Sequence, residues 1–260
     1  MTTLRSPRKY GWHPSLPDYR DQRLTHTALK MSHRPPHFSL VDKMPPVWDQ
    51  SELGSCSAQS SGAAFEYELQ LQKCPIFRPS RLFIYYNARK LEGTTDSDSG
   101  AELRDVIKGL ATYGSPPEVE WPYNEQAFNR APSEACYQHG KKHLVTKYLA
   151  LRQSVADICT TIADGRPVIF GFSVYSGFES EETAKTGILK LPEPDEELVG
   201  GHAVLAVGYS DATRYITVRN SWGANWGQKG YFQMPYAYIE SPSLASDFWV
   251  IQSEMGDVVA

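Results

Sequence analysis

In the first half of the chain, apolar side chains recur every three or four residues, which is the period of an amphipathic helix. Residues 56–72 carry such a pattern without a proline, so we expect a helix there. A second helix is predicted over 81–92, because Ser80 suits an N-cap and Gly93 suits the left-handed conformation that ends many helices. A third is expected over about 103–113, before a Gly-Ser-Pro-Pro stop.

Beyond residue 126 the pattern changes to short apolar runs separated by turn residues, which is typical of antiparallel strands. The runs cover residues 144–151, 167–174, 202–210, 215–222, 230–234 and 248–252. One further helix is expected over 154–164. Two acidic clusters, at 179–182 and 193–197, are expected in solvated loops. A helical part followed by a β-rich part indicates an α+β fold.

The first 35 residues are rich in proline, arginine and histidine and show no sustained period, so we interpret them as an extended leader. Residues 1–37 hold seven basic and two acidic side chains, a net charge of +5. Since the whole chain carries −4, residues 38–260 carry −9. Opposite charges would favour docking of the leader on the body. A solvated, partly disordered leader is the equally weighted alternative.

Composition disfavours several partners and locations. The leader has no dense basic block and the body is acidic, which argues against nucleic-acid binding. No apolar run reaches the roughly 18–20 residues of a membrane helix, so we expect no membrane partner. No apolar core follows the basic start, which argues against a Sec-type signal peptide. The protein would then be cytoplasmic, leave the cell by another route, or begin its mature form elsewhere.

The chain has four cysteines: Cys56, Cys74, Cys136 and Cys159. They form no C-x-x-C pair, so a structural zinc site is poorly supported and no metal is expected. If Cys56 is a free nucleophile, the remaining three cannot all pair within one chain. Disulfides are therefore not expected to support this fold, which favours a reducing compartment. We interpret the other three cysteines as packing residues.

Three polar residues stand at positions that suit nucleophilic chemistry, although each has an ordinary structural interpretation. Cys56 lies at the start of a predicted helix, where N–H groups and the helix dipole lower a thiol's pKa; a single free cysteine is, however, commonly a small buried residue. His202 begins a predicted strand after two glycines and could be a core histidine. Asn220 ends another strand and could simply form a turn.

The three blocks that contain these residues resemble the papain family of cysteine peptidases. QSELGSCSA (50–58) resembles the family's nucleophile block, GGHAVLAVGY (200–209) its histidine block, and VRNSWGANWGQKGY (218–231) its asparagine block. The segment EWPY (120–123) resembles a family landmark between the lobes. The similarity covers roughly residues 40–250, and the last two blocks together are highly specific.

The resemblance implies a two-lobed α+β papain-like fold with the active-site cleft between the lobes. Residues 1–37 would form an N-terminal leader or propeptide. Residues 38–130 would form a mainly helical lobe that carries the nucleophile. Residues 131–260 would form a mainly β, barrel-like lobe that carries the histidine and the asparagine.

The resemblance also implies a role for each residue of the blocks. Cys56 would be the nucleophile, and His202 the base that takes its proton. Asn220 would fix the tautomer and orientation of the imidazole. Trp222 would shield that hydrogen bond from water, besides packing in the core. The Gln50 amide and the Cys56 N–H would form the oxyanion hole. No metal or organic cofactor is required.

The residues that would line the substrate cleft are less clearly marked. We assign Ser99 and Gly100 as the family's glycine-rich cleft stretch. Ala203 would border the pocket that sets peptide preference, Gly201 would widen that region, and Trp222 would lie beside them.

The nucleophile block departs from the family pattern at three positions. Leu53 stands where the family has a disulfide cysteine, so that bridge is absent. Ser57 and Gln59 replace the usual aromatic residues after the nucleophile, which puts the packing of the first helical turn in question. None of these changes removes a group that the chemistry needs.

We therefore expect a cysteine endopeptidase that acts on exposed, extended polypeptide through an acyl-thioester. Two alternatives remain open: an acyl or amide transferase that uses the same triad, and a non-catalytic papain-fold binding module. The intact set of Gln50, Cys56, His202 and Asn220 argues against the module. Residues 1–35 would lie on or near the cleft as a built-in propeptide, which would make the chain a zymogen.

Overall fold

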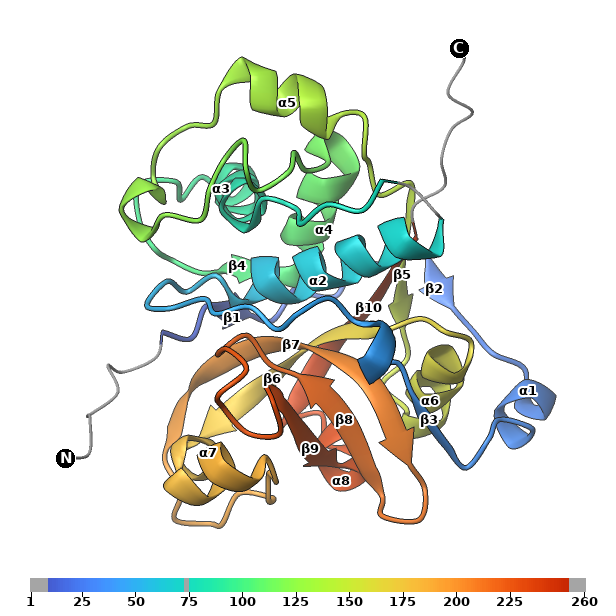
Figure 1. The fold of residues 1–260 in the computed structure, drawn as a ribbon. Coiled ribbons are helices and arrows are strands. Elements are labelled where there is room, and N and C mark those ends of the chain that lie inside the picture. The colour runs from blue at the N-terminus through green and yellow to red at the C-terminus, as the bar shows by residue number, and fades with distance from the viewer. Residues whose placement is uncertain (1–8, 73–74, 253–260) are drawn as a thin grey trace.

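The computed structural model describes residues 9–72 and 75–252, which form a helical lobe and a β lobe (Figure 1). The helical lobe lies at the top of the view and the sheet below it. The predicted α+β arrangement is confirmed. No helix in the described part of the chain is long and apolar enough to cross a membrane. Cys74 falls outside the described residues.

The helical lobe contains the three predicted helices and one that was not predicted. They are α2 (Cys56–Leu71), α3 (Arg81–Glu92), α4 (Leu103–Tyr113) and α5 (Glu134–Gly140). The Ser80 side chain accepts a hydrogen bond from the Phe83 N–H, and Gly93 ends α3 with a φ of 72°. Both ends of α3 are therefore fixed by the residues that predicted them.

Helix α2 is buried on nearly all sides from Cys56 to Leu69. It packs against α3 and α4 within its own lobe and against β7 and β10 of the other lobe. A helix that is buried on all sides has little surface for charged side chains. This explains why α2 is rich in alanine, serine and aromatic residues. Its N-terminus points to the junction of the two lobes and so places Cys56 there.

The β lobe is built on a long sheet that begins with β2 (Arg23–Leu24) and has the order β2-β5-β10-β6-β7-β8-β9, with β3 (His37–Ser39) added beside β7. Neighbouring strands are antiparallel except for β2 and β5, and along this order the sheet does not close on itself. Its main strands are β5 (Lys147–Leu151), β6 (Val168–Tyr175), β7 (Leu198–Ser210), β8 (Tyr215–Arg219), β9 (Tyr231–Pro235) and β10 (Ala245–Gln252). All six predicted strand runs are confirmed.

Shorter elements complete the β lobe and the connections. They are α6 (Val155–Ala163), α7 (Glu181–Thr186), α8 (Tyr236–Glu240) and the 3-10 turns η1 (Val41–Lys43), η2 (Glu125–Ala127) and η3 (Ser176–Glu179). Helix α6 was predicted, whereas α7 and α8 were not. The prediction that 179–182 lies in a loop is wrong: Ser180 caps α7, and Glu181 and Glu182 occupy its first turn, where the helix dipole favours negative charge.

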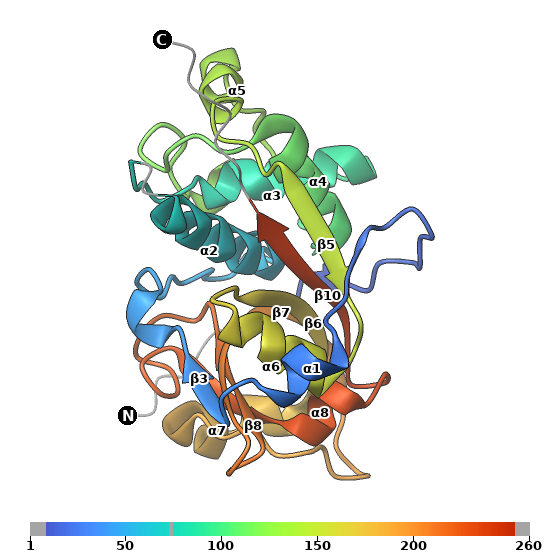
Figure 2. The same cartoon turned by 90° about the vertical axis from the view of Figure 1, so that its right-hand side faces the viewer.

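The N-terminal segment, residues 9–39, runs along the body from one lobe to the other. Strand β1 (Trp12–His13) pairs in parallel with β4 (Ala101–Glu102) of the helical lobe. The chain then projects outward, as the blue loop on the right of Figure 2 shows, and returns at β2 (Arg23–Leu24) beside β5. Helix α1 (Ala28–Ser32) contacts α6, and β3 (His37–Ser39) pairs with β7.

Ion pairs hold this segment to the body. Arg104 binds Asp21 at 2.7 Å, and Arg34 binds Asp211 at 2.8 Å. Lys9 binds Asp98 at 2.8 Å. The segment therefore has regular structure and specific partners on both lobes, where the sequence alone indicated an extended leader.

Glu66 gives the stability of the fold a dependence on pH. Its side chain lies in α2 with the residue 7% exposed, and burial raises its pKa from 4.5 to about 7 despite nearby arginines. The folded protein therefore holds this proton more tightly than the unfolded chain does. We expect the free energy of unfolding to fall as pH rises from about 4.5 to 7 and to level off above that range.

Urea unfolding at several pH values measures this effect. Glu66→Gln should be more stable than the wild type at pH 8 and should lose about half of the decline between pH 5 and 7, because burial raises the pKa of Glu92 to about 7 as well and that residue keeps its share. Glu193→Gln, in an exposed loop, is the matched control and should leave the pH profile unchanged. An identical profile for Glu66→Gln and the wild type would contradict the assignment.

Candidate active site

Cys56 begins α2 at the junction of the lobes and is completely buried. The Ala203 N–H of β7 lies 3.4 Å from its sulfur, and the Gly11 N–H of the N-terminal segment also hydrogen-bonds to it. The backbone N–H groups of Cys56 and Ser57 at the helix start lower the thiol's pKa, as predicted. Burial beneath the segment outweighs them, so in this covered state the pKa of Cys56 is raised, contrary to the sequence prediction.

His202 lies on β7, directly before Ala203, and is completely buried. Its Nε2 is 2.8 Å from the Asn220 Oδ1, which also accepts the Ser221 N–H at 2.8 Å. An amide oxygen accepts hydrogen bonds, so Nε2 carries the proton and Nδ1 is the ring nitrogen left to act on the thiol. The structure thus brings the predicted cysteine, histidine and asparagine together where the two lobes meet.

Aromatic rings enclose the imidazole. The centroid of the Trp222 ring system is 5.2 Å from the His202 ring at an interplanar angle of 31°. The rings of Phe172 and Phe178 lie 5.7 and 6.3 Å from His202 on other sides. The hydrogen bond between His202 and Asn220 is therefore in a water-poor environment, where it is stronger than at a surface.

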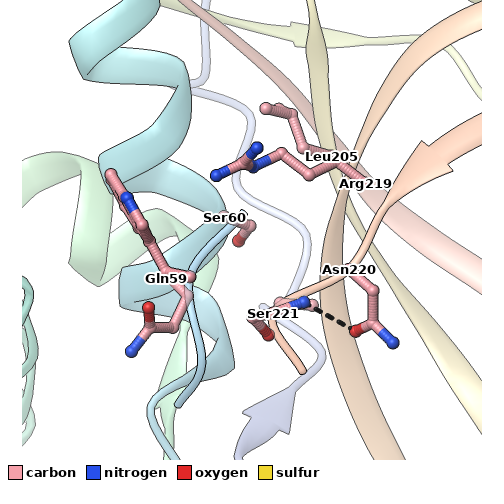
Figure 3. Close-up of a pocket in the computed structure, with 8 residues that line it drawn as sticks. Gln59, Ser60, Leu205, Arg219, Asn220 and Ser221 are labelled. Atoms are coloured by element: carbon pink, nitrogen blue, oxygen red, sulfur yellow. Dashed lines mark hydrogen bonds between the residues drawn. The ribbon is translucent and has the colours of Figure 1, made fainter. Parts of the chain in front are cut away.

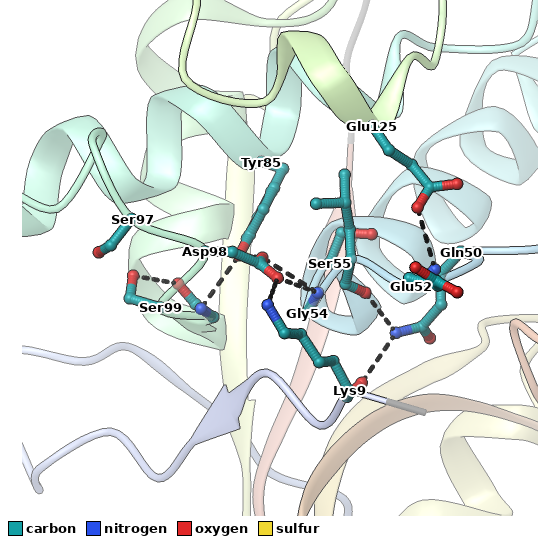
Figure 4. Close-up of polar contacts among 12 residues, drawn as sticks. Lys9, Gln50, Glu52, Gly54, Ser55, Tyr85, Ser97, Asp98, Ser99 and Glu125 are labelled. Carbon is teal, nitrogen blue, oxygen red and sulfur yellow. Dashed lines mark hydrogen bonds and ion pairs between the residues drawn. The ribbon is translucent and has the colours of Figure 1, made fainter. Parts of the chain in front are cut away.

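Gln50 is buried and its amide is held in one orientation. The Oε1 accepts the Ser221 hydroxyl at 2.6 Å, and the Nε2 donates to the Leu53 carbonyl at 2.9 Å. The same Nε2 donates to the Lys9 carbonyl at 3.3 Å (Figure 4). The amide that sequence analysis assigned to an oxyanion hole therefore carries a peptide carbonyl from the N-terminal segment.

The N-terminal segment crosses the cleft where three glycines meet. A Cβ on Gly11 would lie 1.7 Å from the Gly54 carbonyl oxygen, and one on Gly100 would lie 2.2 Å from the Gly11 oxygen. The Ala101 N–H donates to the Gly11 carbonyl at 2.7 Å. The His13 ring is 2.7 Å from the carbonyl of Ser99. The predicted Ser99–Gly100 stretch thus lies beside the segment.

On the β side, the segment contacts β7 closely. A Cβ on Gly201 would lie 2.5 Å from the Trp12 carbonyl oxygen, and one on Gly200 would lie 2.8 Å from the Tyr10 side chain. The Tyr10 ring packs edge-on to His202 with centroids 5.8 Å apart. Side chains larger than hydrogen at either glycine would meet the segment.

Sequence analysis missed the acidic partners of the segment. Asp98 accepts from Lys9 and from the Gly54 N–H, as Figure 4 shows. Glu179 accepts the Tyr10 hydroxyl at 2.6 Å. Asp247 accepts the Trp12 indole N–H at 3.2 Å. All three are acidic residues that contact the basic leader. The charge contrast between leader and body was therefore the signal in the sequence that acidic partners exist.

Polar residues replace the family's aromatic residues after the nucleophile. The Gln59 amide donates to the Ser55 hydroxyl at 3.2 Å and accepts from Arg81 at 3.2 Å. The Tyr123 hydroxyl joins Ser55 at 2.7 Å and donates to the Gln50 carbonyl at 2.8 Å. This network packs the first turn of α2 in place of aromatic rings.

A cavity of about 10 Å³ lies behind the candidate site, with room for about one water molecule (Figure 3). Figure 3 shows α2 residues Gln59 and Ser60 on one side of it, with Asn220 and Ser221 after β8 on the other. The space between the lobes is therefore closely packed behind Cys56, His202 and Asn220.

The papain family cysteine protease model matches residues 35–248, and the chain belongs to this family of hydrolases. Xylellain, a cysteine protease from Xylella fastidiosa, is 40% identical, with a TM-score of 0.90 over 97% of this chain and 100% of that one. The mimivirus "Uncharacterized peptidase C1-like protein L477" is 39% identical over 220 residues, 81% of this chain and 71% of that protein.

More distant relatives agree with this assignment. Cathepsin B-like CP2 of Giardia intestinalis is 29% identical over 74% of this chain, and the match spans 64% of that protein. Procathepsin L 3 of the Tenebrio molitor larval midgut shares the fold at 18% identity, with a TM-score of 0.70 over 90% of this chain and 75% of that one. The predicted family and two-lobed fold are confirmed.

Proposed function

We propose that this protein is an endopeptidase that cleaves extended polypeptide chains through a thioester on Cys56. The observation that carries the proposal is the position of its own N-terminal segment. That segment is a polypeptide in the cleft, with a carbonyl on the Gln50 amide and an N–H on the Cys56 sulfur. The cleft therefore has the shape and the hydrogen-bonding groups to hold a peptide main chain.

In the proposed reaction, His202 Nδ1 takes the Cys56 proton and the thiolate attacks the carbonyl carbon of the scissile bond. The Gln50 Nε2–H and the Cys56 N–H stabilise the resulting oxyanion. The imidazolium then gives its proton to the leaving amine as the C–N bond breaks. Water, deprotonated by His202, hydrolyses the thioester and releases the acid, and the thiol is restored.

Asn220 acts by holding the imidazole in the required tautomer. Because Asn220 Oδ1 accepts from Nε2, the base at Nδ1 stays unprotonated before the reaction and can take the thiol's proton. Trp222 and the neighbouring phenylalanines keep water from this hydrogen bond. Asn220 is thus a positioning residue.

Fluorogenic peptides and an epoxysuccinyl inhibitor test the peptidase assignment. A protein that lacks residues 1–15 should cleave the peptides and should be labelled covalently at Cys56, and Cys56→Ala should do neither. Product analysis with an added amine distinguishes hydrolysis from transfer. Absence of both labelling and cleavage would favour the binding-module alternative.

We further propose that residues 9–13 block the cleft. The Gly11 N–H of the segment acts on the Cys56 sulfur, which is completely buried while the segment is in place. The segment also occupies the Gln50 amide and packs Tyr10 on His202. Each group that the reaction needs is therefore covered by the segment.

Two truncations separate blocking from folding. Removal of residues 1–15 takes away β1 and the contacts of Lys9 and Trp12 but keeps β2 and α1, so peptide hydrolysis should rise while the protein still folds, with a loss of thermal stability limited to those contacts. Removal of residues 1–35 also deletes β2, α1 and the ion pair between Arg34 and Asp211, so stability should fall as well. Unchanged or lower activity in a folded protein without residues 1–15 would reject the blocking role.

A further inference from the structure

The peptide unit between Leu53 and Gly54, just before Cys56, is held at both of its polar groups. Its carbonyl, that of Leu53, accepts a hydrogen bond from the Gln50 Nε2 at 2.9 Å. Its N–H, that of Gly54, donates to the two carboxylate oxygens of Asp98 at 3.1 and 3.2 Å, as Figure 4 shows. Because a peptide unit is planar and rigid, a rotation of this unit would disturb both contacts together.

Asp98 is itself fixed by the helical lobe. Its side chain is 7% exposed, and its Oδ1 accepts the Tyr85 hydroxyl at 2.5 Å. The Tyr85 oxygen accepts the Gly100 N–H at 3.0 Å, and the guanidinium of buried Arg89 lies 4.1 Å from the Tyr85 ring centroid. Arg89 also donates to the carbonyl of Ser97, beside Asp98, at 2.8 Å. None of these contacts involves the N-terminal segment, so they remain when the segment leaves.

The Gln50 amide nitrogen carries two hydrogens and donates to two carbonyls. One carbonyl is that of Leu53 and the other, at 3.3 Å, is that of Lys9 in the N-terminal segment. In the proposed reaction the oxyanion takes the place of the Lys9 carbonyl. Since the two hydrogens of a planar amide are fixed relative to each other, the Leu53 carbonyl determines where the second hydrogen points.

We propose that Asp98 is a positioning residue for the oxyanion hole, which acts on Gln50 through the peptide unit between Leu53 and Gly54. Asp98 fixes the N–H of this unit, and the carbonyl of the unit fixes one amide hydrogen of Gln50. The other hydrogen is thereby directed at the oxyanion. Hydrogen bonds in such a chain also strengthen one another away from water. This inference rests on the proposed peptidase function and adds a residue that acts behind the oxyanion hole.

Kinetics of the protein without residues 1–15 test this role. Lys9 is absent there, so an effect of Asp98 cannot arise from holding the segment. Asp98→Ala should lower kcat and kcat/KM together, by about tenfold to a hundredfold, because loss of a whole oxyanion donor costs about 10²–10³-fold. Asp98→Asn keeps an oxygen for the Gly54 N–H and should stay within about threefold of the parent. An unchanged kcat in Asp98→Ala would overturn the proposal.

A double substitution shows whether Asp98 acts through Gln50. Gln50→Ala removes the amide that Asp98 positions. In that background, Asp98→Ala should lower kcat by less than about twofold more, whereas two independent effects would multiply. A second full loss would mean that Asp98 acts by another route, and it would reject the proposal.

Two controls separate positioning from stability. Asp96→Ala removes an exposed carboxylate from the same loop and should change neither kcat nor KM. Asn87→Ala removes a buried acceptor of the Tyr137 hydroxyl, between α3 and α5, so it should lower thermal stability without lowering kcat. A loss of kcat in Asn87→Ala equal to that in Asp98→Ala would attribute the effect to stability and overturn the proposal.

Tyr85→Phe decides the question if Asp98→Ala does not fold. It keeps the carboxylate of Asp98 but removes a donor that fixes it. A loss of kcat with an unchanged KM would support the proposal, and an unchanged kcat would reject it.

A peptide aldehyde gives a result that does not depend on turnover. The Cys56 sulfur bonds to the aldehyde carbon as the C=O double bond becomes a single bond, and the thiol's proton passes through His202 to the former carbonyl oxygen. That oxygen occupies the oxyanion position, so Asp98→Ala should weaken aldehyde binding about tenfold. Alkylation by iodoacetamide, in which the thiolate displaces iodide without an oxyanion, should keep its rate. Equal aldehyde binding by Asp98→Ala and the parent would reject the proposal.

The assays distinguish failure of this inference from failure of the proposed function. Cleavage of peptides at equal rates by Asp98→Ala and the parent would reject the role of Asp98 and leave the peptidase assignment intact. Absence of all cleavage by a folded parent that is alkylated at Cys56 would reject the peptidase assignment. In that case the aldehyde comparison alone decides whether Asp98 positions Gln50.

Discussion

Replacement of Cys56 by serine, in the protein without residues 1–15, should lower kcat/KM for peptides by about 10⁴-fold or more. Serine keeps the size and the hydrogen-bonding position of the thiol, so the fold and peptide binding should change little. A serine hydroxyl is far less acidic than a thiol, and the neighbouring imidazole with its asparagine partner is not arranged to activate it as strongly. The loss should therefore lie in kcat and not in KM.

Two comparisons make this measurement specific. Cys136→Ser is the matched control, because Cys136 is a buried cysteine of α5 that lies 3.2 Å from the Ser133 hydroxyl, outside the cleft. It should retain full activity. Comparable loss in both variants would mean that the cysteine changes act through the fold, and retention of activity in Cys56→Ser would remove the nucleophile from the proposed mechanism.

The parts of the fold that could be predicted are those that local sequence determines. Helix α3 begins at Ser80 and ends at Gly93 because each residue makes a local contact or adopts a local conformation that few others allow. The strands around His202 follow from apolar runs between turns. Helices α5, α7 and α8 have only five to seven residues, too few for a periodic pattern to be recognised.

Cys56, His202 and Asn220 were predicted from three recognisable blocks, and residues 1–35 were expected to lie on or near the cleft, but the residues that enter it were not identified. Contacts of residues 9–13 depend on glycines at 54, 100 and 201, which come together only in the folded chain. The charge contrast between leader and body, with the leader's place before the peptidase-like region, indicated docking on or near the cleft but not the residues that make the contacts. The same contrast could not single out Asp98 or Asp247 among the 30 acidic residues of the chain.

The raised pKa of Cys56 shows why one segment can change the chemistry of the site. The helix start lowers the thiol's pKa, as the sequence predicted, but burial opposes it and is the larger effect while the cleft is covered. Departure of the segment would return water to the sulfur and reduce that penalty. Opening the cleft would therefore expose the nucleophile and also favour its thiolate.

Gly11→Ala in the full-length chain should open the cleft without removing any residue. The new Cβ would lie 1.7 Å from the Gly54 carbonyl oxygen and 2.7 Å from its Cα, and these are backbone atoms that cannot rotate away. Overpacking of this kind typically destabilises the packed state by about 1–3 kcal/mol. Because the penalty falls only on the docked segment, the open form should become about 5- to 150-fold more populated.

Peptide hydrolysis by the full-length protein measures this shift directly. Gly11→Ala should raise activity toward that of the protein without residues 1–15, and it should speed labelling of Cys56 by the epoxysuccinyl inhibitor by a similar factor. Gly109→Ala in α4 is the matched control, because a Cβ there would lie 3.8 Å from the nearest atom, the Ala88 nitrogen. It should change neither rate. The truncated protein lacks residue 11, so the effect of Gly11→Ala can be measured only where the segment is present. If Gly11→Ala left both rates at the wild-type level, contact between Gly11 and Gly54 would not control access to the nucleophile.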